Sequence, residues 1–92
     1  MATYFMFGKY SLDAIKAISA KRTQDTVATI RQHGGELKSA YALLGDVDLV
    51  LIVDLADTGQ AMKTSAALSQ LLGISFSTAP AMGVEEFDKL IG

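Results

Sequence analysis

Cysteine is absent from this chain of 92 residues, and proline occurs once, at Pro80. The absence of cysteine excludes disulfides, thiolate metal sites, iron–sulfur clusters and cysteine nucleophiles. Long hydrophobic runs are also missing, because the longest, residues 49–53, is far shorter than the roughly 20 residues that span a bilayer. No basic segment precedes the apolar N-terminal residues, so no signal peptide is expected. We therefore expect a cytoplasmic protein with no membrane partner.

Positive charge is scarce as well. Eight Lys and Arg residues stand against ten Asp and Glu residues, and the formal net charge is −2. Nucleic-acid binding normally requires a basic face that displaces counterions from phosphates. Here the basic residues are dispersed, and only Lys21 and Arg22 are adjacent. We therefore expect no nucleic-acid partner.

The size of the chain leaves room for a single domain over residues 1–92. Half of the residues are hydrophobic and 20% are charged, which is typical of a globular domain. A domain this small, without disulfides, depends on its own core or on a partner that enlarges the core.

The hydrophobic pattern predicts four strands, over residues 3–10, 36–43, 48–54 and 74–79. The first is rich in Phe and Tyr, and the third contains the densest run of apolar residues. Between the first two strands, Leu12, Ile15 and Ile18 share one helical face. We expect a helix that begins near Leu12, a break near Ser19 and a main helix to about His33.

A second long helix is expected over residues 58–72, with Asp57 as its N-cap and Gly73 at its end. Its expected inward positions are Ala61, Ser65, Leu68 and Leu72. A short terminal helix over residues 84–91 would carry its apolar residues on one side. The order βαββαβ followed by a helix predicts an α+β, ferredoxin-like fold with the first and third strands in the middle of the sheet.

The two central strands are apolar on both faces. Phe5 and Phe7 alternate with Tyr4 and Met6, although a sheet with one wet face should alternate apolar with polar residues. Right-handed crossovers place both helices on a single face, so the other face requires a different cover. We expect a second copy of the chain there. The sequence leaves a homodimer and a larger ring as alternatives.

Three stretches resemble the GYD domain family, and the resemblance covers nearly the whole chain. They are Gly8-Lys9-Tyr10, residues 41–50, and Ala79-Pro80-Ala81 followed by residues 84–87. The family's Gly-x-Tyr-Asp motif is matched by Gly45-Asp46-Val47-Asp48, in which Val47 replaces the aromatic residue. The resemblance implies a small prokaryotic protein of the dimeric α/β-barrel type. Proteins of that type include cofactor-free monooxygenases, isomerases and lyases as well as ligand-sensing modules.

Five residues are candidates for a ligand site: Asp48, Tyr41, Tyr10, Lys9 and His33. Asp48 and Asp46 could form a carboxylate pair at the mouth of a cleft, or bind local backbone in a turn. Tyr10 and Tyr41 could line a pocket with their hydroxyls, or pack at an interface.

Lys9 could supply an amine of lowered pKa, or extend from a strand end into solvent. His33, the only histidine, could act as a general base, or stabilise the C-terminus of a helix. No metal site and no cofactor are expected, because one histidine and dispersed carboxylates do not form a ligand set. We favour a self-associating module that holds a small organic ligand. The alternative is a cofactor-independent isomerase, lyase or monooxygenase that acts on a small organic acid or aromatic compound.

Overall fold

The computed structural model describes all residues from Met1 to Gly92. The elements follow the expected order, with the first crossover divided into two helices. They are β1 (Ala2–Tyr10), α1 (Leu12–Lys16), α2 (Ala20–Gln32), β2 (Glu36–Ala42), β3 (Leu49–Leu55), α3 (Thr58–Leu72), β4 (Ile74–Ala81) and α4 (Val84–Ile91). No helix is both long enough and apolar enough to cross a membrane.

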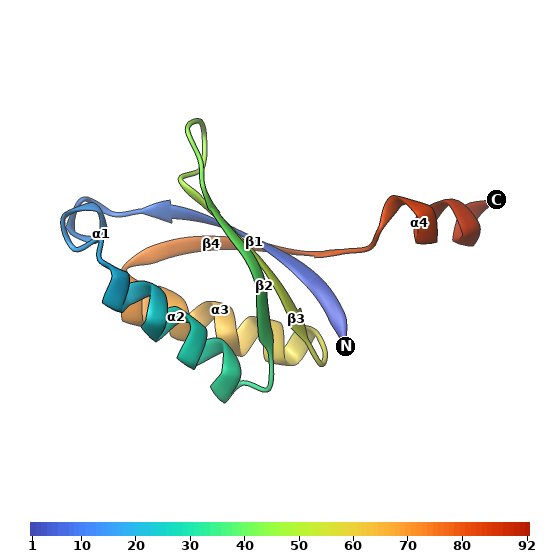
Figure 1. Ribbon diagram of the computed structural model, residues 1–92, viewed down its shortest axis with the longest axis horizontal. Helices are drawn as coiled ribbons and strands as arrows, with labels where there is room; N and C mark the ends of the chain where they lie inside the picture. Colours follow the sequence, from blue (N-terminus) through green and yellow to red (C-terminus); the bar gives the residue numbers. More distant parts are fainter.

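The four strands form one antiparallel sheet in the order β2-β3-β1-β4. The apolar strands β1 and β3 lie in the middle, as predicted. Met6 stands opposite Leu51 on one side and opposite Thr78 on the other. Helices α2 and α3 cover one face of the sheet, whereas α4 extends away from it (Figure 1). The expected ferredoxin-like fold is confirmed.

The core lies between the sheet and helices α2 and α3. Met6, Val53 and Leu55 of the central strands are fully buried, together with Ile30 of α2 and Leu68 of α3. Burial of each such side chain contributes roughly 1.5–3 kcal/mol to the stability of the fold. These contacts hold the two long helices at a fixed position over β1 and β3.

Side chains and glycine mark the helix ends. The hydroxyl of Ser11 accepts a hydrogen bond from the Ala14 backbone N–H at 3.0 Å, and Ser19 caps α2 in the same way. The carboxylate of Asp57 accepts from the Gln60 N–H at 2.9 Å. Gly73 ends α3 with a φ of 68°, a left-handed conformation that favours glycine. The predicted break near Ser19 is therefore a second N-cap.

The apolar stripe expected on the first helix does not face the core. Leu12, Ile15 and Ile18 are exposed, and Ala14 is the buried residue of α1. A helix of five residues covers little of the sheet, and only its smallest side chain fits against β1 and Gly73. Ile18 lies in the segment after the helix.

Two other expectations need correction. On α3, Thr64 rather than Ser65 is buried between Ala61 and Leu68, because a helical stripe tolerates spacings of three and four residues. Strand β4 continues to Ala81 and includes Pro80. Proline is compatible with this edge strand because its missing N–H removes no bond that the sheet requires.

Candidate functional site

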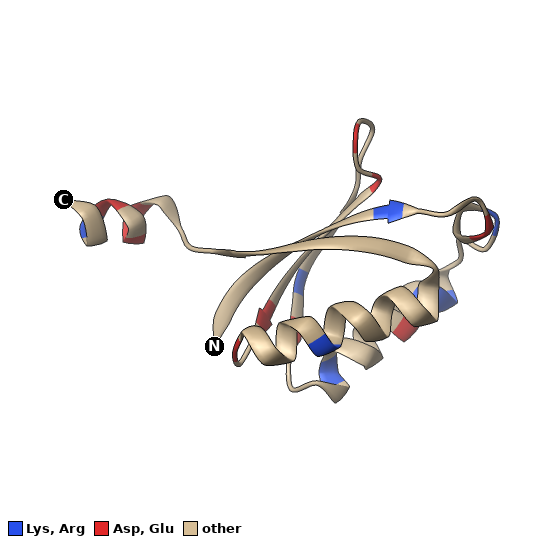
Figure 2. Cartoon of the chain, turned by 180° about the vertical axis from the view of Figure 1, so that it is seen from behind, with Lys and Arg blue, Asp and Glu red and all other residues tan.

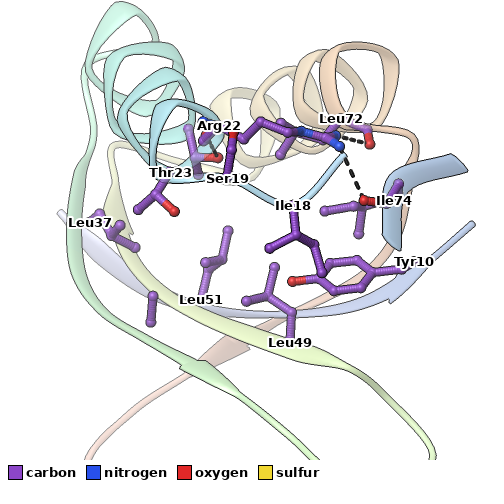
Figure 3. A pocket seen from close by; sticks show the side chains of 13 residues that line it. Tyr10, Ile18, Ser19, Arg22, Thr23, Leu37, Leu49, Leu51, Leu72 and Ile74 are labelled. Carbon is purple, nitrogen blue, oxygen red and sulfur yellow. Dashed lines mark hydrogen bonds between the residues drawn. The ribbon is translucent and has the colours of Figure 1, made fainter. Parts of the chain in front are cut away.

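A cavity of about 100 Å³ lies between the sheet and the beginning of α2. Its walls are mostly apolar and come from several elements. The residues that line it include Tyr10, Ile18, Leu37, Leu49, Leu51, Leu72 and Ile74 (Figure 3). An apolar cavity of about 150 Å³ in another protein stays dry and binds benzene. The cavity therefore has the size and lining suited to a small organic molecule.

Arg22 provides positive charge in the wall of this cavity. Its guanidinium donates hydrogen bonds to the backbone carbonyls of Ala14, at 3.3 Å, and Leu72. It thereby joins α2 to α1 and to the C-terminal end of α3. A guanidinium has five N–H donors, so two such bonds leave others available for a ligand.

Tyr10 supplies a hydroxyl at the opposite wall. Its side chain lies on the helix side of β1 and is partly buried against the core. The hydroxyl points toward the interior of the cavity between Ile18 and Leu49 (Figure 3). Ser19, Thr23 and other lining residues add further polar groups. The site thus combines an apolar body with a few polar groups, as small-molecule sites do.

Asp48 holds the backbone of Tyr10. One carboxylate oxygen of Asp48 accepts a hydrogen bond from the Tyr10 N–H at 3.0 Å, and its own N–H donates to the Gly8 carbonyl at 2.8 Å. The aspartate that carries the match to the GYD motif therefore joins the end of β1 to the start of β3. Asp46 is exposed in the turn before it.

Asp48 does not line the cavity, and the other three candidate residues also lie outside it. Tyr41 is exposed on β2, opposite Val50 of β3. Lys9 is exposed near the end of β1. His33 follows the last residue of α2, and its Nδ1 lies 2.9 Å from the Thr29 carbonyl oxygen. The structure brings Tyr10 and Asp48 together, but of the five candidates Tyr10 alone lines the cavity.

Sequence reasoning did not identify Arg22 as a site residue. The sequence shows only that Arg22 stands beside Lys21, and this pair indicates local positive charge rather than a binding site. The side chain reaches carbonyls from residues 8 and 50 positions away in the chain. Sequence spacing does not predict such contacts. The whole structure contains no group of three or more His, Cys, Asp or Glu residues that could hold a metal ion.

The helix-free face of the sheet is a second candidate for function. Its apolar centre consists of Phe5, Phe7, Val50 and Ile52, which pair across β1 and β3. The two phenyl rings lie 6.2 Å apart between their centroids. At one end of this face, Thr3 donates a hydrogen bond to Asp54 at 2.9 Å. An apolar centre with polar groups at its edge is the usual arrangement of a protein interface.

A wider groove of about 330 Å³ runs between α3 and the edge strand β4. The hydroxyl of Tyr4 lies 3.4 Å from that of Thr58 there. Its lining includes Ser65, Ser69 and Thr78 beside apolar residues, with no charged side chain. The groove therefore offers less to orient an ionic ligand than the cavity beside Arg22.

The fold and the cavity define a ferredoxin-like α+β domain with room for a small molecule. The GYD domain family model matches residues 4–91, and the chain belongs to this family. No curated protein sequence matches the chain significantly.

Similar solved structures include the leucine response regulatory protein of Mycobacterium tuberculosis, at 12% identity and a TM-score of 0.60 over 89% of this chain and 51% of that one. A transcriptional regulator has 14% identity and a TM-score of 0.64, over 90% of this chain and 51% of the regulator. A feast or famine regulatory protein from M. tuberculosis, complexed with L-methionine, has 14% identity and a TM-score of 0.59. The match covers 90% of this chain and 51% of that protein. The chain spans about half the length of these proteins. The similarity establishes the fold.

Proposed function

We propose that this protein is a self-associating module that binds a small organic acid with an apolar body. The observation that carries the proposal is the apolar cavity with Arg22 in its wall. A carboxylate would meet the guanidinium, and the apolar body would contact Leu49 and Leu51. The similarity to a regulator that was crystallised with an amino acid supports ligand binding in this fold.

Self-association is supported by the helix-free face. Phe5, Phe7 and Ile52 are partly exposed and, with the buried Val50, form an apolar patch on the face of the sheet opposite the long helices. A second copy can present the same patch across a two-fold axis, and a face of this kind is complementary to itself. We therefore propose that a second copy covers this face, in a homodimer or in a larger homo-oligomer.

The binding proposal is tested with benzoate and benzamide, which share a shape and differ in charge. In an NMR titration of the ¹⁵N-labelled protein, benzoate should shift the amide signals of residues around the cavity, such as Tyr10, Ile18 and Leu49. Benzamide should bind more weakly, because a charge-assisted hydrogen bond is roughly twice as strong as a neutral one.

Two alanine substitutions on β2 provide a matched pair. Ala40 lines the cavity, whereas Ala42, two residues along the same strand, does not. Ala40→Leu should reduce benzoate binding because the larger side chain takes up cavity volume, and Ala42→Leu should bind as the parent chain does. Equal effects of the two variants, or shifts scattered away from the cavity, would contradict the proposal. Conversion of benzoate during the titration would instead favour the cofactor-independent enzyme.

A further inference from the structure

The terminal helix α4 has no buried residue. Its apolar side chains, Val84, Phe87, Leu90 and Ile91, are between 51% and 74% exposed. Isolated helices shorter than about 12–15 residues are marginal in water, and most helices in proteins are stabilised by packing an apolar face. Because α4 has 8 residues, its apolar face requires a surface to pack against.

The body of the same chain does not provide that surface. Beyond the last residue of β4, Met82 and Gly83 lead α4 away from the sheet and from helices α2 and α3 (Figure 1). Helix α4 lies beyond the end of the sheet where Thr3 of β1 pairs with Ala81. The partner of its apolar face must therefore be another molecule.

A second group of exposed apolar side chains lies at the opposite end of the strands. Leu12, Ile15 and Ile18 are between 49% and 78% exposed around α1, which follows directly after the last residue of β1. Leu12 and Ile15 are separated by three residues, so they share one side of the short helix. Figure 1 shows α1 and α4 at opposite ends of the molecule.

We propose that α4 of one copy packs against the α1 region of a second copy, with the reciprocal contact made at the same time. The inference rests on the self-association proposed above. If two sheets meet through their helix-free faces around an axis that runs across the strands, the two copies point in opposite directions. Each α4 then lies at the end of the partner that carries α1, and the contact occurs twice.

Charge complementarity favours the α1 region of a second copy as the partner of α4. Helix α4 carries three anions, Glu85, Glu86 and Asp88, and one cation, Lys89, for a net charge of −2. Residues 9–25 carry four cations, Lys9, Lys16, Lys21 and Arg22, and two anions, Asp13 and Asp25, for a net charge of +2, with Asp25 paired to Lys21 at 2.9 Å. Figure 2 shows acidic residues on α4 and basic residues near α1 at the other end. Opposite potentials across an interface favour this pairing over other surfaces of the chain.

Disulfide cross-linking tests the contact directly, because the chain has no cysteine of its own. A mixture of the single variants Ile15→Cys and Leu90→Cys should form a covalent dimer under mild oxidation. Neither variant alone should do so, since equivalent α4 helices lie at opposite ends of the dimer. The double variant should form a dimer closed by two disulfides, whereas head-to-tail chains would give a ladder of larger species.

Ala28→Cys, at an exposed position of α2, replaces Ile15→Cys in the matched control. A covalent yield no higher than that of the control would overturn the proposal. Light scattering on the same samples distinguishes failure of the α4 contact from failure of self-association. Dimers without specific cross-linking would overturn the α4 contact alone, whereas monomers throughout would overturn self-association as well.

Charge exchange provides a second measurement that does not depend on thiol geometry. The variant Glu85→Lys/Glu86→Lys and the variant Lys9→Glu/Lys16→Glu should each self-associate about fivefold more weakly than the parent chain. A mixture of the two should recover the parent affinity, because both contacts in the mixed dimer then join opposite charges. Weakening without recovery in the mixture would contradict the proposed contact.

Discussion

The carboxylate of Asp48 accepts a hydrogen bond from the backbone N–H of Tyr10, 38 residues earlier in the chain. This bond fixes the end of β1 against the start of β3, at the point where the Tyr10 side chain enters the cavity. A direct contact between Asp48 and a ligand stays a prediction. Its hydrogen bond to the backbone already explains why an aspartate suits this position of the GYD motif.

Replacing Asp48 should therefore reduce stability. Asp48→Ala should lower the free energy of unfolding by about 1–2 kcal/mol, because the partly buried Tyr10 N–H loses a charged acceptor. Asp48→Asn keeps an acceptor oxygen and should cost less. Urea denaturation at a fixed protein concentration measures both. Asp46→Ala, in the exposed part of the turn, serves as the control, and an equal loss for Asp46→Ala would contradict the assignment.

Gly34 and Gly35 should respond to substitution for different reasons. Gly35→Ala should destabilise the fold by about 1–3 kcal/mol, because a Cβ would lie 2.7 Å from the Asp54 carbonyl oxygen and closer still to a Leu55 methyl. Gly34→Ala meets open space, and its positive φ of 75° should cost only about 1 kcal/mol. Thermal unfolding of the two variants should rank them in this order. A larger loss for Gly34→Ala would show that backbone conformation outweighs the steric clash.

A charge in the centre of the helix-free face should dissociate the protein. Ile52→Asp would place a carboxylate between Phe5 and the neighbouring strand β2, where burial against a second copy would remove it from water. Sedimentation or light scattering should then report a monomer of 9.8 kDa. Met62→Asp, at an exposed position of α3, should leave the assembly intact. Retention of the parent mass by Ile52→Asp would place the interface elsewhere.

Arg22 should contribute both to stability and to the preference for an anion. Arg22→Lys should lose about 1–2 kcal/mol of stability, because an ammonium group lacks the planar fork that reaches the Ala14 and Leu72 carbonyls together. It should still prefer benzoate to benzamide. Arg22→Gln should lose that preference, as measured by NMR titration under conditions where both variants remain folded. Equal binding of both probes by the parent chain would remove Arg22 from the proposed site.

The order of elements was determined by local sequence. A continuous apolar run rich in β-branched residues specifies β3, and the caps Ser11, Ser19 and Asp57 act over three residues. Gly73 adopts the left-handed conformation in which glycine lacks a steric penalty. Such short-range constraints do not depend on the rest of the fold. They sufficed to predict the βαββαβ order and the central position of the apolar strands.

Tertiary structure alone decided which apolar residues face the core and where the cavity lies. The spacing of Leu12, Ile15 and Ile18 predicts a helical face, but α1 is too short to bury it, and these side chains remain exposed. Arg22 lines the cavity because α1, α2 and the end of α3 converge around its guanidinium. Contacts between residues as far apart as Arg22 and Leu72 depend on how the helices cross the sheet, which no local pattern encodes.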